Sequence, residues 1–232
     1  MKKVNEIRSL EINKDILSKW QGIVDIMAEL INVPAGLIMR IRESDIEVFV
    51  ASNTEGDPYH PGDKELLVGS GLYCETVIKT KDKLLIPNAT TDEKWKANPD
   101  IKLGMISYLG FPILFPTGEV FGTICVLDNK ENAYSEVYEQ LILEFKELIE
   151  SHLSLLDKSQ ALELANKELA DSLSEIKVLR GMFPMCSFCK KVRDDNGYWR
   201  DVEEYIKTHS EADFSHGFCP ECLKKYYPDY ID

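Results

Sequence analysis

Hydrophobic and polar positions divide the chain into stretches of helical and of strand-like spacing. Between residues 14 and 31 the apolar side chains recur every three or four positions, which predicts an amphipathic helix that ends at Asn32-Val33-Pro34. Residues 36–41 and 46–51 are apolar runs joined by a short polar turn, and together they predict a β-hairpin. A second hairpin is expected from residues 105–115 and 120–127, which flank a turn sequence that contains proline and glycine.

The region between the two hairpins has a weaker pattern. We expect a polar loop over residues 52–69, a short helix over 72–79, a brief strand at 84–86 and another short helix over 91–99. Pro112 lies inside the first strand of the second hairpin. Because proline has no N–H to donate to a sheet, we expect it at an edge or a bulge.

The longest periodic stretch runs from Ser135 to Arg180 without glycine or proline. Leucine recurs there every seven residues, which is the spacing of a coiled-coil seam, at Leu141, Leu148, Leu155, Leu162 and Leu169. The companion seam positions are Phe145, His152, Ser159, Asn166 and Leu173. We expect one helix that covers a domain first and then pairs with a second chain as a parallel homodimer. The alternative is a long amphipathic helix packed on its own chain.

The order of these elements predicts an α+β domain, in which an antiparallel sheet carries the first and last helices on one face. The irregular middle of the chain would then cover the other face, where a ligand pocket forms most easily. Candidate pocket residues are the aromatic and small side chains of that stretch: Tyr73, Thr76, Trp95, Met105 and Tyr108. The alternative is that these side chains only close the hydrophobic core.

Charge and hydropathy restrict the class of protein. The formal net charge of the 232 residues is −13, which argues against a nucleic-acid-binding face because such a face is rich in Lys and Arg. No apolar run reaches the roughly 20 residues that span a bilayer, and the first residues lack the apolar core of a secretion signal. We therefore expect a cytoplasmic protein that binds neither nucleic acid nor membrane.

Four of the six cysteines form two Cys-x-x-Cys pairs near the C-terminus, Cys186 with Cys189 and Cys219 with Cys222. Two such pairs can complete a tetrahedral Cys₄ shell, so we expect one structural Zn²⁺ per chain in a small ribbon-like module. Iron and a redox-active dithiol remain as alternatives, and His216 could replace one thiolate. The residues between the pairs predict a hairpin with an Asn-Gly turn, followed by a short helix over 201–208.

Four ordered motifs resemble those of GAF domains: GLYCETVI at residues 71–78, IPNA at 86–89, YLGFPI at 108–113 and FGTICVLD at 121–128. The resemblance covers residues 14–156 and implies a sensory or ligand-binding domain that often dimerises through its flanking helices. Residues 157–180 would be a coiled-coil transmitter helix. Residues 181–232 resemble a cysteine-rich module that is appended to bacterial and archaeal PAS, GAF and receiver proteins, where by analogy it serves docking or output.

These features predict a non-enzymatic signal-transduction protein that senses an unidentified small molecule and acts through a partner signalling protein. One alternative is a GAF-type methionine sulfoxide reductase, which would need Cys74 and Cys125 as reactive and resolving thiols. Another is a haem or bilin sensor, for which His60 and His152 are the available axial ligands.

Overall fold

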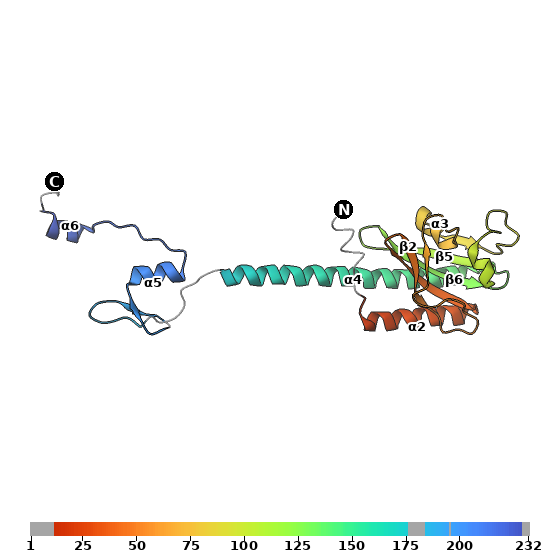
Figure 1. Cartoon of the computed structure of the whole chain (residues 1–232), viewed down its shortest axis with the longest axis horizontal. Coiled ribbons are helices and arrows are strands. Elements are labelled where there is room, and N and C mark those ends of the chain that lie inside the picture. The colour runs from red at the N-terminus through yellow and green to blue at the C-terminus, as the bar shows by residue number, and fades with distance from the viewer. Residues whose placement is uncertain (1–11, 176–183, 195, 229–232) are drawn as a thin grey trace. The chain divides into compact units, whose positions relative to one another are not determined.

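The computed structural model describes residues 12–175, 184–194 and 196–228 (Figure 1). Contacts divide the chain into two compact units, with the division between Leu162 and Glu163. Among the described residues, no helix is both long and apolar enough to cross a membrane. The expected C-terminal end of the long helix, at Arg180, lies outside the described residues.

The first predicted helix is confirmed as α2, Lys14–Ile31. Its N-terminus is capped by Asn13, whose side-chain oxygen accepts a hydrogen bond from the Ile16 amide at 2.9 Å. The apolar stripe of α2 is buried, and Trp20 on it is completely shielded from solvent. The helix ends where Asn32 takes a left-handed conformation, with φ of 58°, which asparagine tolerates better than most residues.

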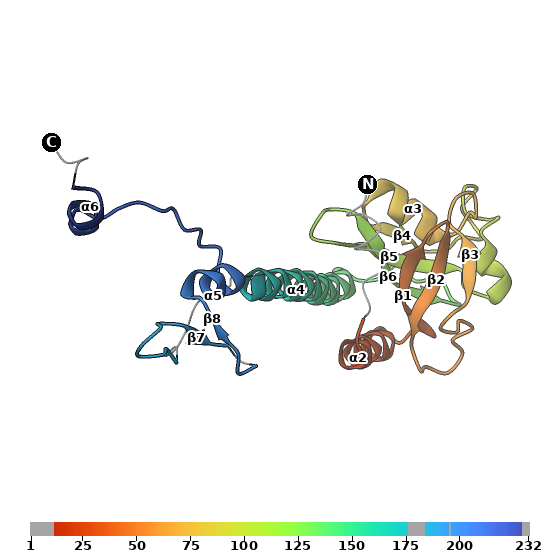
Figure 2. The same cartoon turned by 60° about the vertical axis from the view of Figure 1, so that its left-hand side comes forward.

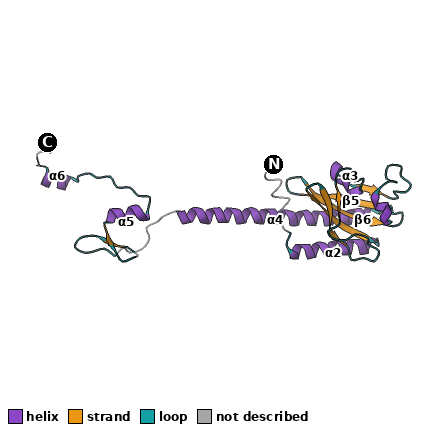
Figure 3. Ribbon diagram, viewed as in Figure 1, coloured by secondary structure: helices purple, strands orange, loops and turns teal. Residues whose placement is uncertain are grey.

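The first unit contains a six-stranded antiparallel sheet with the strand order β3-β2-β1-β6-β5-β4 (Figure 2; the strands are orange in Figure 3). Its strands are β1 (Ala35–Arg42), β2 (Asp45–Ala51), β3 (Lys64–Leu66), β4 (Leu84–Ile86), β5 (Ser107–Leu114) and β6 (Val120–Asp128). Both predicted hairpins and the predicted strand at 84–86 are confirmed. Pro112 lies beyond the part of β5 that pairs with β4, as its missing N–H requires.

The two faces of the sheet have different covers. The helix face packs α2 and the first half of α4 (Glu136–Glu175) against strand residues such as Ile38 and Ile124. The loop face packs α3 (Tyr73–Thr80) and the irregular chain against residues such as Leu37 and Met39 (Figure 2). The predicted arrangement, with both long helices on one face and the irregular middle on the other, is therefore confirmed.

Two local predictions in the irregular middle are wrong. Residues 91–98 form turns instead of a helix, and a 3₁₀ helix, η1 (Pro99–Leu103), follows them. Pro99 disfavours helical backbone at Asn98 and leaves that residue to cap η1. The expected loop over residues 52–69 contains β3, whose side chains are all exposed and therefore leave no hydrophobic signal.

The long helix begins as predicted, since the Ser135 hydroxyl oxygen accepts a hydrogen bond from the Tyr138 amide at 3.4 Å. In its first half, Ile142, Ile149 and Leu153 are completely buried against the domain. The seam leucines behave differently, because 44% of Leu148 and about 60% of Leu155, Leu162 and Leu169 are exposed (63%, 62% and 58%).

The second unit contains short elements beyond the end of α4. Strands β7 (Val192–Arg193) and β8 (Trp199–Arg200) form the predicted hairpin, in which Gly197 has φ of 88°. Asp194 holds this turn by accepting hydrogen bonds from the Asn196 and Tyr198 amides. Helices α5 (Val202–His209) and α6 (Pro220–Tyr226) follow.

Candidate functional site

A cavity of about 330 Å³ lies on the loop face of the sheet. Strands β1, β2 and β6 supply an apolar wall, and η1 together with the chain around β3 supplies a polar one. The lining residues are Leu37, Met39, Ile46, Val48, Pro58, Tyr59, Asp63, Lys64, Glu65, Leu72, Cys74, Asp100, Leu103, Tyr108, Cys125 and Leu127. This volume and mixed lining are typical of a site for one small molecule.

The apolar wall follows from strand alternation. Leu37 and Met39 on β1 point to the loop face, whereas Ile38 between them packs under α2. Ile46 and Val48 on β2 follow the same rule, and Glu47 between them pairs with Arg40 on the neighbouring strand. The period of two residues thus places four apolar side chains in the cavity wall.

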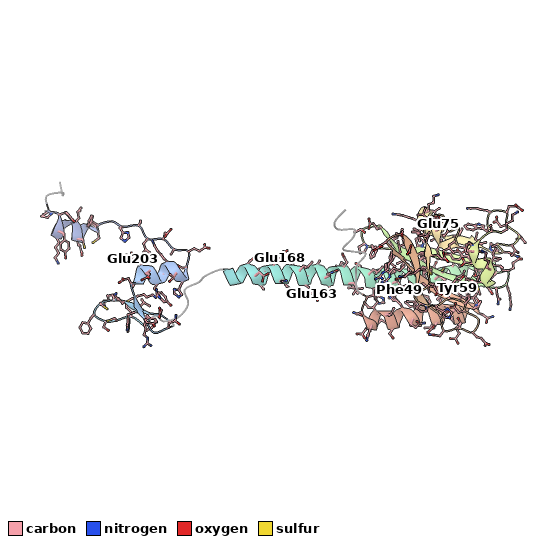
Figure 4. All side chains as sticks on the ribbon, in the orientation of Figure 1. Phe49, Tyr59, Glu75, Glu163, Glu168 and Glu203 are labelled. Atoms are coloured by element: carbon pink, nitrogen blue, oxygen red, sulfur yellow. The ribbon has the colours of Figure 1, made fainter. Side chains whose placement is uncertain are left out.

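Tyr59 and Asp100 form the central polar contact of the site. The Tyr59 hydroxyl donates to Asp100 Oδ1 at 2.8 Å, although the two residues come from separate segments (Tyr59 is labelled in Figure 4). Asp100 is only 7% exposed, and burial raises the pKa of its carboxyl to about 6 even though the Tyr59 bond acts in the opposite direction. Its main-chain amide donates to Asn98 Oδ1, which fixes the start of η1.

The loop that carries Tyr59 is held by a second acidic residue. Asp57 accepts hydrogen bonds from the Ser52 hydroxyl and from the Tyr59 amide, each at 2.9 Å. Burial raises the pKa of the Asp57 carboxyl to about 6, while these two bonds and nearby His60 limit the rise. The position of Tyr59 therefore depends on hydrogen bonds within its own loop as well as on Asp100.

Charge at the cavity is predominantly negative. Asp63, Glu65 and Asp100 line it, against the single ammonium of Lys64. That ammonium lies 3.7 Å from Glu47 Oε2, so part of its charge is already compensated. Among the described residues, Asp100 has no ion pair, and its carboxylate therefore has no cation of the protein to balance it.

Tyr108 on β5 lines the cavity and is completely buried. Its ring lies along the sheet over Gly110, where a Cβ atom would collide with the Tyr108 hydroxyl. The hydroxyl reaches Cys74 Sγ at 3.5 Å, and Thr123 Oγ1 donates to the same sulfur at 3.3 Å. Gly110 is therefore required for the ring to take this position.

The five predicted pocket residues occupy different positions around this cavity. Tyr108 lines it. Tyr73, Trp95 and Met105 are buried in the loop-face core, where the Tyr73 ring lies between the Trp95 and Tyr108 rings at centroid distances of 5.3 and 4.8 Å. Thr76 is half-buried on α3 and is not among the lining residues. Their role in binding a ligand stays a prediction.

Sequence reasoning missed Tyr59, Asp100 and the strand side chains of the wall. The strand side chains could have been found, because the alternation in β1 and β2 assigns them to the loop face. Tyr59 and Asp100 are brought together only by the tertiary fold. The one signal for Tyr59 is an aromatic residue after a proline in an otherwise polar loop.

The histidines proposed as axial ligands are not among the residues that line the cavity. His60 is exposed in the loop before β3, 3.7 Å from Asp63. His152 lies on the helix face, where its Nδ1 accepts a hydrogen bond from the Trp20 indole at 3.1 Å. Burial lowers the pKa of His152, which fits its role as a neutral acceptor between α2 and α4.

The C-terminal cysteines form two separate pairs of closely spaced thiols. The Cys186 sulfur accepts hydrogen bonds from the amides of Cys189 and Phe188, and these bonds lower its pKa. Cys219 caps α6 and accepts from the Cys222 amide at 3.4 Å, which lowers its pKa in the same way. Within the described residues, no group of three or more Cys, His, Asp and Glu side chains is close enough to hold a metal ion.

His216, considered as a substitute ligand, instead contacts an acidic side chain. Its Nε2 lies 3.2 Å from Glu203 Oε2 on α5 (Glu203 is labelled in Figure 4).

Comparison with known structures supports the fold. Residues 122–287 of a methyl-accepting chemotaxis protein match with a TM-score of 0.54 and 16% identity, over 67% of this chain and 99% of that chain. A bacteriophytochrome of R. palustris matches with a TM-score of 0.53 and 11% identity, over 71% of this chain and 39% of that chain. The GAF domain of a Coxiella burnetii phosphoenolpyruvate-protein phosphotransferase matches with a TM-score of 0.52 and 12% identity, over 68% of this chain and 92% of that chain.

At these identities the similarity establishes the fold alone. No curated protein sequence matches this chain. The GAF domain family, however, matches residues 21–154, which are more than half of the 232 residues. The same residues contain the sheet, α3, the cavity and the buried half of α4. The chain therefore belongs to the GAF domain family, whose members occur in sensors and signalling proteins.

Proposed function

We propose that this chain is a non-enzymatic sensory protein. Its GAF domain binds a small molecule in the loop-face cavity, paired α4 helices transmit the response, and the C-terminal module docks a partner signalling protein. The observation that carries this proposal is the cavity of about 330 Å³ with its apolar wall and its buried carboxylate. The paired thiols of the module fit a reducing compartment, so we place the protein in the cytoplasm.

The charge of the cavity favours one class of ligand. Asp100 is buried and ionises at a cost, and a cationic group beside it would remove that cost. The rings of Tyr59 and Tyr108 offer further favourable surfaces for a cation, and the strand residues accommodate an apolar body. The proposed ligand is therefore a compact amine whose basic nitrogen pairs with Asp100.

The test is retention of metabolites by the full-length protein. The immobilised protein is incubated with an extract of small metabolites and washed, and the retained compounds are identified by mass spectrometry. Val48→Phe, which fills the cavity from β2, should abolish retention, and Asp100→Asn should weaken it at least tenfold. A retained compound without a basic nitrogen would refute the assignment to amines. If Val48→Phe retains every compound that the wild-type protein retains, the cavity is not a ligand site.

The exposed leucines of α4 support the proposed dimer. Leu155, Leu162 and Leu169 each expose more than half of their surface at seven-residue spacing, and a second helix would bury them. The companion seam positions Phe145 and His152 pack within their own domain instead. The proposed contact between the two α4 helices therefore lies mainly beyond residue 157. In that part α4 also carries charged side chains, among them Glu163 and Glu168, which are labelled in Figure 4.

The C-terminal module suits a structural zinc ion in its donor chemistry. Cys186, Cys189, Cys219 and Cys222 supply four sulfur atoms, and the main-chain amides that already point at Cys186 and Cys219 would stabilise their thiolates. When bound, zinc would link the two pairs and so stabilise a module whose hydrophobic core is small. The module would then present exposed aromatic residues, such as Phe188 and Phe218, to a partner protein.

The reductase alternative makes a distinct prediction. An enzyme would reduce free methionine sulfoxide repeatedly in the presence of excess dithiothreitol, and the sensory proposal requires no such turnover. Sustained formation of methionine that is abolished by Cys74→Ser would contradict the proposal.

A further inference from the structure

Two cysteines outside the C-terminal module meet at the cavity. Cys74 is the second residue of α3, and Cys125 lies in the middle of β6. The two thiols are neighbours, since each perturbs the ionisation of the other, and the Tyr108 hydroxyl lies 3.5 Å from Cys74 Sγ. Both residues line the cavity, although Cys74 is only 8% exposed and Cys125 is fully buried. A molecule that enters the cavity therefore meets the Cys74 thiol, which bulk solvent hardly reaches, with the Cys125 thiol close to it.

The surroundings of the two sulfurs differ. Cys74 Sγ accepts a hydrogen bond from Thr123 Oγ1 at 3.3 Å and contacts the Tyr108 hydroxyl at 3.5 Å. It also lies in the first turn of α3, where main-chain amides favour a negative charge. Cys125 lies within the sheet, and burial raises its pKa well above the usual value. Cys74 is therefore the better nucleophile of the pair, and Cys125 stays protonated beside it.

We propose that Cys74 and Cys125 form a peroxide-sensitive dithiol that converts to a disulfide when a small hydroperoxide enters the cavity. The Cys74 thiolate attacks the terminal oxygen of the hydroperoxide, the O–O bond breaks, and the alcohol leaves with a proton while Cys74 becomes a sulfenic acid. The Cys125 sulfur then attacks the Cys74 sulfur, and water leaves. In total the two thiols lose two protons and two electrons, and the hydroperoxide is reduced to one alcohol and one water.

The consequence is a covalent link between α3 and the central strand of the sheet. The disulfide would remove the hydrogen-bonding interaction between Cys74 and the Tyr108 hydroxyl and would change the cavity wall at that point. The inference depends only on the proximity of the two thiols and on access to Cys74 from the cavity. It stands whether or not the cavity also binds an amine.

The test uses the reduced full-length chain and tert-butyl hydroperoxide. After brief exposure, free thiols are alkylated in acid, and the protein is digested with trypsin without reduction. Residues 65–79 and 103–130 should appear as one disulfide-linked peptide pair, each containing one cysteine. In Cys125→Ser, dimedone should label Cys74 as the sulfenic acid. In Cys74→Ser, dimedone should leave Cys125 unlabelled.

A conservative variant tests whether Cys74 is an activated thiol or only a buried one. Thr123→Val keeps the shape of the side chain but removes the hydrogen bond to Cys74, so the linked peptides should form roughly tenfold more slowly. Cysteines of the C-terminal module report in the same digest that the oxidant was active. The proposal is overturned if those cysteines oxidise while residues 65–79 and 103–130 stay unlinked, or if dimedone labels Cys125 in Cys74→Ser.

Discussion

Replacing Asp100 by asparagine should stabilise the GAF domain at neutral pH. Asparagine has nearly the same shape, and its carbonyl oxygen can still accept the hydrogen bond from Tyr59. It removes only the charge. Burial raises the pKa of Asp100 from 3.8 to about 6, which at about 1.4 kcal/mol per tenfold change in proton affinity is worth about 3 kcal/mol.

The pH dependence of this gain has a definite sign. Because the pKa is higher in the folded state than in the unfolded one, folding binds a proton between pH 3.8 and about 6. The wild-type domain therefore loses stability as the pH rises through this range and remains at the lower value above it. Asp100→Asn should gain about 2 to 3 kcal/mol at pH 8 and little near pH 4. The stability of Asp100→Asn should still fall slightly as the pH rises, because the pKa of the Asp57 carboxyl is also raised to about 6.

The assay is urea unfolding of the full-length chain at several pH values between 4 and 8, followed by tryptophan fluorescence. Trp199→Phe is included in every protein, so that the signal comes from Trp20 and Trp95, both buried in the GAF domain. Asp63→Asn is the matched control, because Asp63 lines the same cavity but is exposed, and it should change stability by less than about 0.5 kcal/mol. A loss of stability at pH 8, or an equal gain at pH 4 and pH 8, would refute the reasoning.

Three further predictions concern the helix, the sheet and the module. Leu162→Lys with Leu169→Lys should give monomers in analytical ultracentrifugation, whereas Leu164→Lys, equally exposed but off the seam, should leave the dimer; a monomeric wild type would contradict the pairing. Gly110→Ala should cost about 1 to 3 kcal/mol by displacing the adjacent tyrosine ring, and unchanged near-UV circular dichroism would argue against this packing. Cys189→Ser should lower zinc below one equivalent per chain in metal analysis and expose the module to proteolysis, and metal-free wild-type protein would disprove the site.

Local sequence signals were sufficient to predict most elements of the fold. The α2 stripe ends at an asparagine and a proline, and both central hairpins are joined by turns with clear chemistry, so their boundaries follow from neighbouring residues. The strand β3 could not be found in this way, because it pairs through its main chain and exposes every side chain. Pro99 was a local signal that a helix could not continue through residue 99.

The site was less predictable because it depends on contacts between distant segments. Tyr59 and Asp100 become partners only when the loop before β3 meets η1. Cys74 and Cys125 likewise meet only when α3 packs on β6, so their spacing in the sequence carries no signal. The seam position His152 likewise has a partner that local sequence does not reveal, since α2 supplies Trp20 within the same domain.

The central claim is that binding of a ligand in the cavity changes the conformation of the long helix α4. Hydrogen–deuterium exchange of the full-length protein, with and without the compound retained from the metabolite extract, tests it most directly. Binding should slow exchange in the loop around Tyr59 and in η1, and should also change exchange along α4 beyond residue 157, where the helix makes no contact with the cavity. Protection confined to the cavity, with unchanged exchange in α4, would contradict the account.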